Sequence, residues 1–139
     1  MAKLLAKIAD ANFSNIRLYT DDVRDVVAAL PQASLGRVFI LFPDPWHKKR
    51  HHKRRFVQTA MLDGLARVMK AGAELRFATD DPGYLDWALE RLVAHRDLRW
   101  LAKSAADWRV RPADWPETRY ETKAKQAGRA CSYLRFTRV

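Results

Sequence analysis

The chain has 139 residues, and its 26 lysines and arginines outnumber 16 aspartates and glutamates, so the formal net charge is +10. This length suffices for one domain with a buried core, and a hydrophobic content of 48% excludes a disordered chain. The single cysteine, Cys131, excludes an internal disulfide, and no run is long and apolar enough to cross a membrane. We therefore expect one domain (residues 1–139) in the cytoplasm, with a polyanion such as nucleic acid as its partner.

The hydrophobic pattern predicts alternating helices and strands. In chain order, the expected elements are a helix over 1–12, a strand over 15–19, a helix over 23–30, a strand over 37–42, a helix from about 51 to 72, a strand over 73–78, a helix after Asp81-Pro82 and a closing strand over 132–139. Residues 108–118 hold two prolines and two tryptophans without periodicity, which predicts a loop. This order is typical of an α/β fold with a parallel sheet.

Two of these elements carry more detailed expectations. The run from Arg37 to Phe42 is almost entirely apolar, as expected for a strand covered on both faces. The helix from about His51 should bury one stripe of side chains. This stripe comprises Phe56, Ala60, Met61, Leu65 and Val68.

Three aspartates follow three of the predicted strands. Asp22 follows the first strand, Asp44 the second and Asp80 the third. In open α/β sheets, ligands bind outside the carboxyl ends of the strands. We therefore expect these carboxylates along one edge of the sheet, with Asp81 rather than Asp80 as the cap of the next helix.

The segment Phe42-Pro43-Asp44-Pro45-Trp46 is the strongest single signal in the sequence. Each proline fixes its own φ and biases the preceding residue toward extended conformations, so Asp44 is held in a stiff segment. Such a segment can also be a rigid turn whose aspartate caps a backbone N–H. Its position at the end of a strand favours a functional carboxylate.

Residues 47–55 are all histidine, lysine or arginine. A run of this kind is often a solvated face or a localisation signal. A zinc site at His47 and His51 is disfavoured because the neighbouring cations would repel a divalent ion, and we expect no metal. Several cations at the start of a helix suit phosphate binding, and Trp46 beside them could stack on a base.

These motifs together resemble the bacterial tRNA (guanine-N7)-methyltransferase family. The resemblance rests on FPDPWHKKRHHKRR at 42–55, ATD at 78–80 and TRYE at 118–121, and it extends along essentially the whole chain. It implies a Rossmann-like class I methyltransferase fold that uses S-adenosylmethionine to methylate N7 of a guanine in the tRNA variable loop. It further implies that tRNA is the partner.

The resemblance also implies roles for individual residues. Asp44 would be the catalytic acid, and together with Asp22 it would bind the cofactor. The substrate-binding residues would be Lys48, Asp80, Thr118, Arg119, Tyr120 and Glu121. The basic residues expected to contact the RNA backbone are Lys49, Arg50, Lys53, Arg54 and Arg55.

The chain departs from the family at its start. Family members begin with a strand, a glycine-rich turn, a helix and a second strand that ends in a carboxylate. The five glycines of this chain include no GxG pair. We therefore expect a sheet without its first β-α-β segment, so that residues 1–139 form the C-terminal two-thirds of a methyltransferase domain. A preceding segment or a second chain would complete the sheet.

Three other functions stay open at this point. A methyltransferase that acts on an exocyclic amine can use a related acid–proline segment, although that pattern usually has an aromatic residue directly after two prolines. The second alternative is a non-catalytic tRNA- or RNA-binding fragment that lacks the cofactor half. The third is a basic structural domain without catalytic or RNA-binding function.

Overall fold

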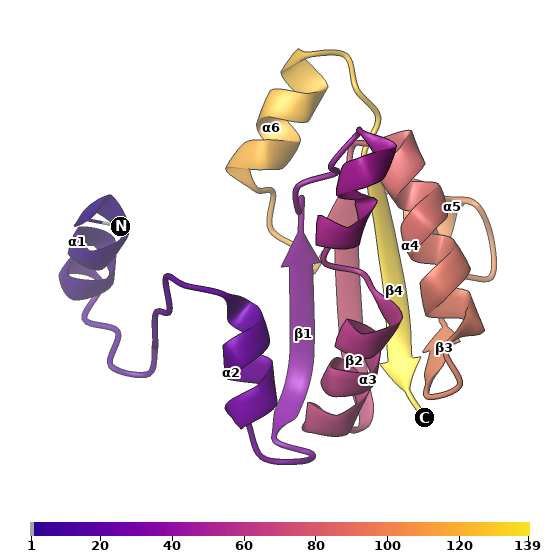
Figure 1. The fold of residues 1–139 in the computed structure, drawn as a ribbon. Helices are drawn as coiled ribbons and strands as arrows, with labels where there is room; N and C mark the ends of the chain where they lie inside the picture. Colours follow the sequence, from indigo (N-terminus) through magenta and orange to yellow (C-terminus); the bar gives the residue numbers. More distant parts are fainter. Residues whose placement is uncertain (1) are drawn as a thin grey trace.

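The computed structural model describes residues 2–139 (Figure 1). Its strands are β1 (Leu35–Leu41), β2 (Met69–Thr79), β3 (Leu98–Trp100) and β4 (Ser132–Arg138). Its helices are α1 (Ala2–Asp10), α2 (Val23–Ala29), α3 (Thr59–Val68), α4 (Pro82–Ala94), α5 (Ala106–Arg109) and α6 (Arg119–Gln126), with a 3₁₀ helix, η1, at Lys49–Arg54. Within residues 2–139, no helix combines the length and the apolar character needed to cross a membrane.

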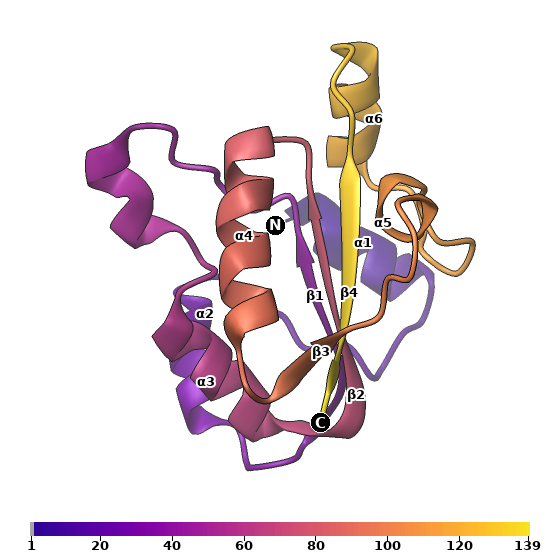
Figure 2. The same ribbon diagram turned by 90° about the vertical axis from the view of Figure 1, so that its right-hand side faces the viewer.

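The strands form one sheet in the order β1-β2-β4-β3. β1 and β2 are parallel, whereas β4 is antiparallel to both β2 and β3. Figure 2 shows α2, α3 and α4 on one side of the sheet and α5 on the other. α1 stands apart from the sheet (Figure 1). The parallel α/β arrangement expected for β1 and β2 is confirmed, and the sheet is mixed because of β4.

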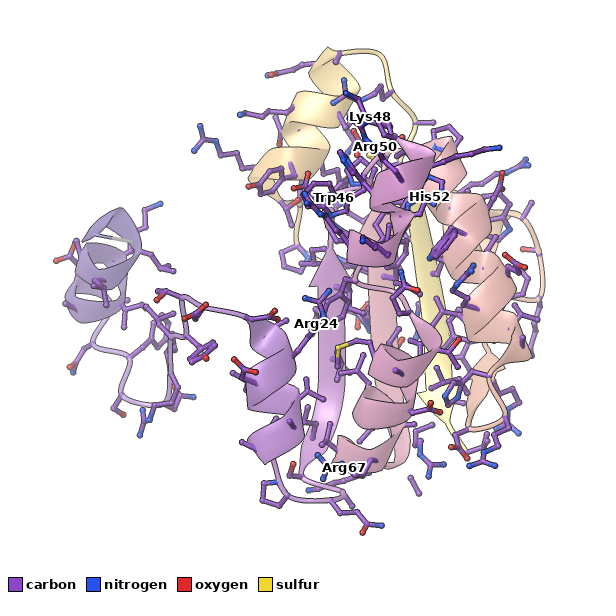
Figure 3. All side chains as sticks on the ribbon, in the orientation of Figure 1. Arg24, Trp46, Lys48, Arg50, His52 and Arg67 are labelled. Carbon is purple, nitrogen blue, oxygen red and sulfur yellow. The ribbon has the colours of Figure 1, made fainter. Side chains whose placement is uncertain are left out.

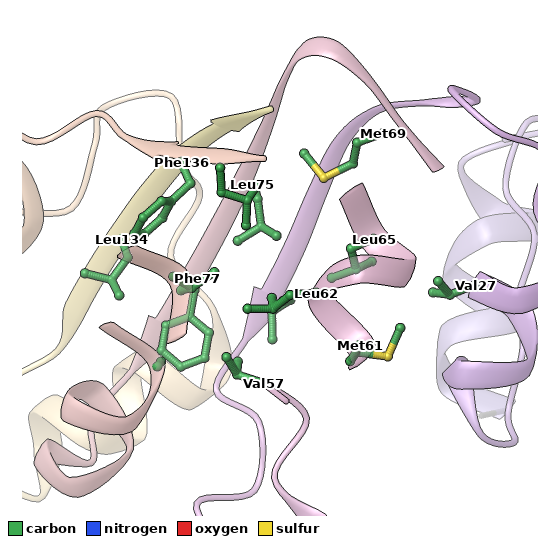
Figure 4. Close-up of a cluster of buried hydrophobic side chains, with 14 of the residues drawn as sticks. Val27, Val57, Met61, Leu62, Leu65, Met69, Leu75, Phe77, Leu134 and Phe136 are labelled. Atoms are coloured by element: carbon green, nitrogen blue, oxygen red, sulfur yellow. The ribbon is translucent and has the colours of Figure 1, made fainter. Parts of the chain in front are cut away.

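The core lies between the sheet and the helices α3 and α4. Leu75 and Phe77 project from β2 toward Leu62 of α3, and all three side chains are fully buried (Figure 4). Leu134 and Phe136 extend the same layer across β4. Burial of each such side chain contributes about 1.5–3 kcal/mol. This layer holds β1 and β2 at a fixed spacing, so the ends of the two strands form a rigid base for a site.

Several predicted elements are confirmed. The strands predicted at 37–42, 73–78 and 132–139 correspond to β1, β2 and β4. Asp81 caps α4, as predicted, by accepting a hydrogen bond from the Tyr84 amide at 2.6 Å, and Asp22, which directly precedes the predicted helix at 23–30, caps α2 by accepting one from the Arg24 amide. Local capping signals were therefore reliable guides to where helices begin.

The predicted helix from about His51 is wrong. The chain forms η1, becomes extended at Arg55, and starts α3 only at Thr59. Arg55 causes the break, because its side chain is only 3% exposed and donates a hydrogen bond from Nε to the Pro45 carbonyl at 2.7 Å. Ala60, predicted to face inward, is exposed on the first turn of α3.

The start of β2 also differs from the prediction. Lys70, Ala71 and Gly72, expected to close the preceding helix, lie in β2, and Gly72 has a φ of +77°. The pairing with β1 jumps here from Leu35–Met69 to Arg37–Glu74. The extra residues form a bulge that a glycine in the left-handed region allows.

Other differences concern elements without local signals. Residues 15–19, predicted as a strand, are exposed and form no strand, because no other segment of residues 2–139 pairs with them. β1 is not covered on both faces, since Phe39 is 45% exposed. The predicted loop at 108–118 holds the end of α5, and its Trp115 is buried. β3 and α6 were not predicted.

Candidate functional site

The segment after β1 has an unusual backbone. The Phe42 amide donates a hydrogen bond to the Ala78 carbonyl at 2.8 Å, which continues the pairing of β1 with β2. Phe42 and Trp46 then adopt φ values of +50° and +47°, in the left-handed region that non-glycine residues rarely enter. Pro43 and Pro45 stiffen the chain between them. The strained, rigid turn holds Asp44 exposed at the carboxyl end of β1.

A cavity of about 380 Å³ lies beside this turn. It is enclosed by the ends of β1 and β2 and by the first turns of α6. Its lining residues are Phe42, Pro43, Asp44, Pro45, His47, Asp80, Asp81, Tyr120, Lys123 and Arg129. Asp44 and Asp80 thus share one cavity, as expected for residues at the carboxyl ends of adjacent parallel strands. Asp22, the third predicted acid, is not among the lining residues.

The three carboxylates of this cavity have different partners. Asp81 caps α4 and lies 3.3 Å from Nδ1 of His47. Asp80 accepts a hydrogen bond from Nε of Arg129 at 2.6 Å. Asp44 has neither a hydrogen bond nor an ion pair with any side chain described over residues 4–139. Its carboxylate is therefore free to interact with a bound molecule.

One wall of the cavity is aromatic. Tyr120 is 64% exposed, and its ring is stacked near that of Phe42 with 6.4 Å between centroids and 18° between planes. The exposed ring offers a flat surface for another aromatic system. Lys123, on the next turn of α6, adds a positive charge to the lining.

The other residues of the 118–121 motif lie outside the cavity lining. The Thr118 hydroxyl caps α6 by accepting a hydrogen bond from the Glu121 amide, and Arg119 is exposed. Glu121 is buried, and its carboxylate accepts hydrogen bonds from the Tyr133 hydroxyl and from Nζ of Lys125, each at 2.7 Å. The substrate contacts predicted for these three residues stay predictions, and the geometry gives Glu121 a structural role.

The pKa values of this cluster follow from its contacts. Burial raises the pKa of Glu121, but hydrogen bonds from Lys125 and Tyr133 and the positive charge of Arg111 outweigh burial and hold the pKa below its usual range. The same contacts raise the pKa of Tyr133, through burial first and the neighbouring carboxylate second. Glu121 is therefore charged, and Tyr133 is a hydrogen-bond donor to it.

The basic run forms a cationic surface on η1. In Figure 3, Lys48 directly before this 3₁₀ helix and Arg50 and His52 on it lie near the carboxyl ends of β1 and β2. Lys48, Lys49, Arg50, Lys53 and Arg54 are all exposed. Arg55 is a correction: its guanidinium is buried over the rings of Tyr84 and Trp87, so it cannot contact an RNA backbone.

The structure offers little for a cofactor at the predicted positions. Asp22 is exposed, and hydrogen bonds from the Arg24 amide and guanidinium lower its pKa and occupy both carboxylate oxygens. Of the described glycines, none lines the cavity. Over residues 2–139, no group of three or more histidine, cysteine, aspartate or glutamate side chains could hold a metal ion.

The contacts of two candidate functional residues in the cavity were not predicted from the sequence. Arg129 reaches Asp80 from the turn before β4, where Gly128 has a φ of +69°. His47 turns back toward Asp81. The sequence held no signal for the first contact, because 49 residues separate its two partners.

Comparison with known proteins is consistent with this geometry. The family model described as "Putative methyltransferase" matches residues 1–134. A tRNA (guanine-N(7)-)-methyltransferase of Rhodospirillum rubrum is 53% identical over 138 residues, which cover 99% of this chain and 54% of that protein. Proteins of the same name from Chelativorans sp. and Ruegeria pomeroyi are 49% and 50% identical over 139 residues, covering all of this chain and 60% and 58% of those proteins.

The chain thus spans between half and three-fifths of the length of these relatives. The mixed four-stranded sheet and the family match are those of a Rossmann-like methyltransferase of which this chain holds a part. The resemblance read from the sequence is confirmed: with 134 of its 139 residues matched, the chain belongs to this methyltransferase family.

Proposed function

We propose that the chain acts in the transfer of a methyl group from S-adenosylmethionine to N7 of a guanine in the variable loop of tRNA. The observation that carries this proposal is the cavity lined by both Asp44, whose carboxylate has no partner among the described side chains, and the exposed ring of Tyr120, beside the cationic helix η1. The relatives that match the chain carry the name of this activity.

The acceptor chemistry fits the cavity. Guanine N7 has a lone pair and no proton, so its methylation requires no general base. The methylated base carries a positive charge, which a fixed anion stabilises as it develops. Asp44 provides that anion, and it also accepts hydrogen bonds that orient the base. Tyr120 provides a stacking surface, and positioning supplies the rest of the rate enhancement.

The binding site for the methyl donor is less complete than the site for the guanine base. S-adenosylmethionine supplies an electrophilic methyl group when it is bound. Asp44 lines the cavity and can contact the donor as well as the base. Both carboxylate oxygens of Asp22, in contrast, accept hydrogen bonds from Arg24. The described residues therefore fit the acceptor base better than the adenosine of the donor, and we assign no further donor contact to them.

A direct assay tests the proposed function. The 139-residue chain is incubated with an unmodified tRNA transcript and S-adenosylmethionine labelled on its methyl group, and the tRNA is then cleaved chemically at N7-methylguanine. We expect one cleavage site in the variable loop. Label at another base, or at an exocyclic amine, would refute the proposed position.

A second function, RNA binding without methyl transfer, is favoured by one observation. Within residues 2–139, no glycine lines the cavity beside Asp44, so this part of the chain provides no glycine-lined cradle for a nucleoside there. Isothermal titration with S-adenosylmethionine separates the two functions. Heat of binding favours the enzyme, and retained tRNA affinity without such heat favours the binding module.

Removing single cations from η1 should weaken tRNA binding without changing which tRNAs bind. Each lost phosphate contact lowers the slope of log K against log salt by about 0.7–0.9. We expect this change for Lys49→Ala and Lys53→Ala, whose side chains are exposed. Lys70→Ala, at the opposite end of the sheet, is the control with an equal change of charge. Equal slopes for all three variants would make η1 a solvated face.

A further inference from the structure

The largest cleft described in the chain is not the one that holds Asp44. It has a volume of about 1040 Å³ and lies between α2 and α3, below η1. We propose that this cleft binds a second nucleotide of the same RNA whose guanine enters the Asp44 cavity. This proposal rests on the proposed function, because it assigns a further part of the substrate to the neighbouring surface.

The cleft combines an apolar floor with a cationic rim. Val27 of α2 and Met61 of α3 form part of the floor, and the two helices meet where Val27 approaches Gly64. The charged side chains in its lining are Arg24, Lys53, Arg54 and Arg67, and no carboxylate lines it. Figure 3 shows Arg24 reaching from the first turn of α2 toward α3, and Arg67 at the far end of the two helices.

The four cations differ in their contacts, and Arg24 already donates a hydrogen bond from Nη1 to Asp22 at 2.9 Å. Arg67 is committed to the protein, since its guanidinium donates hydrogen bonds to the carbonyls of Val27, Ala28 and Leu30. It ties α3 to the end of α2 and closes the cleft at that side. Lys53 and Arg54 are exposed at the opposite side, next to η1. These two residues are available for a phosphate.

Trp46 makes the cleft suitable for a base as well as a phosphate. Its ring is half-buried in the lining, and the guanidinium of Arg54 lies 4.9 Å from the ring centroid. Aromatic rings paired with arginine are the usual stacking platform for bases in single-stranded nucleic acids. A flat aromatic group over an apolar floor, with phosphates at a cationic rim, matches the chemistry of a nucleotide.

The two cavities meet at one segment. Pro45 and His47 line the Asp44 cavity, whereas Trp46 between them lines the α2–α3 cleft. The φ of +47° at Trp46 turns the chain so that adjacent residues face different sides. A nucleotide next to the reacting guanine can therefore reach the cleft along η1. This continuity with the cationic surface favours RNA over a protein partner as the occupant.

Ala60 offers a sharp test of this proposal. It is exposed in the first turn of α3 and lines the cleft, so Ala60→Glu adds a negative charge there. A carboxylate at this end of a helix is favourable for folding. We expect Ala60→Glu to weaken binding of an unmodified tRNA transcript by roughly tenfold, because a like charge opposes the phosphates. Ala60→Gln, without the charge, should have a smaller effect.

Val93→Glu is the matched control, because Val93 is exposed on α4 and the change in net charge is the same. It should leave tRNA affinity nearly unchanged, and thermal unfolding confirms that all variants fold. Equal weakening by Ala60→Glu and Val93→Glu would overturn the proposal, since net charge alone would then explain the loss.

Crosslinking gives an independent readout. The chain is irradiated with tRNA that contains 4-thiouridine and then digested with trypsin. We expect crosslinks on the peptides 25–37 and 56–67, which carry the two walls of the cleft, in addition to peptides of η1. Crosslinks confined to η1 would overturn the proposal. Neither readout needs methyl transfer. If the chain binds tRNA through the cleft but does not methylate it, the proposed function is refuted and the cleft proposal stands.

Discussion

Asp44→Asn is expected to lower the single-turnover rate of methyl transfer by about 10²–10³, the usual effect of removing one preorganised electrostatic group. The substitution keeps the size of the side chain and removes its charge. Asp44 has no described partner within residues 4–139, so its loss should not disturb the turn that Pro43 and Pro45 hold. The affinity for tRNA, which depends on many phosphate contacts, should change little.

Asp86→Asn is the matched control for this prediction. Asp86 is an exposed residue on α4, outside both cavities, and it undergoes the same chemical change. Single-turnover rates with saturating tRNA report the chemical step, and filter binding reports affinity. Equal rates for the two variants would remove Asp44 from the chemistry. A loss of affinity with an unchanged rate at saturating tRNA would make it a binding residue only.

The elements with local signals could be predicted from the sequence. The apolar runs of β1, β2 and β4 and the capping residues Asp22 and Asp81 depend on neighbours a few positions away, which the sequence displays directly. The shared cavity of Asp44 and Asp80 followed from one topological rule, because both residues end parallel strands. Local pattern and topology thus placed two of the three predicted acids, Asp44 and Asp80, whereas Asp22 lies outside the cavity because the strand expected before it does not form.

Contacts between distant segments could not be predicted. Arg54 and Arg55 are equivalent in the sequence, yet Arg54 is exposed and Arg55 is buried, because Tyr84 and Trp87 lie in α4 about thirty residues further on. The basic run therefore could not reveal where its helix ends. α6 was missed for a similar reason: its polar sequence gains its stability from Glu121, whose partner Tyr133 lies in β4.

Glu121→Gln is expected to lower the free energy of unfolding by about 3 kcal/mol at neutral pH, the usual cost of breaking a buried ion pair. The carboxylate is buried and is held by Lys125, Tyr133 and Arg111. The variant leaves the positive charges of Lys125 and Arg111 beside a neutral amide. Urea unfolding of both proteins measures the difference, and the variant should begin to unfold at α6.

The pH dependence of this difference identifies its cause. The folded-state pKa of Glu121 lies below its ordinary value of 4.5, so the stabilisation is fully present above about pH 4.5 and is lost as pH falls through the folded-state pKa. Glutamine does not titrate. The gap between wild type and Glu121→Gln should therefore be constant near neutral pH and shrink in acid.

The variant Glu117→Gln distinguishes the stability contributed by the buried carboxylate of Glu121 from that contributed by a more exposed carboxylate nearby. Glu117 lies just before the cap of α6, is more exposed, and is near the same two cations, 3.5 Å from Nζ of Lys125 and 3.8 Å from the Arg111 guanidinium. Because exposed pairs contribute at most about 1 kcal/mol, we expect a much smaller loss for this variant. If Glu121→Gln instead keeps full stability and only weakens tRNA binding, Glu121 contacts the substrate, and α6 must open to present it.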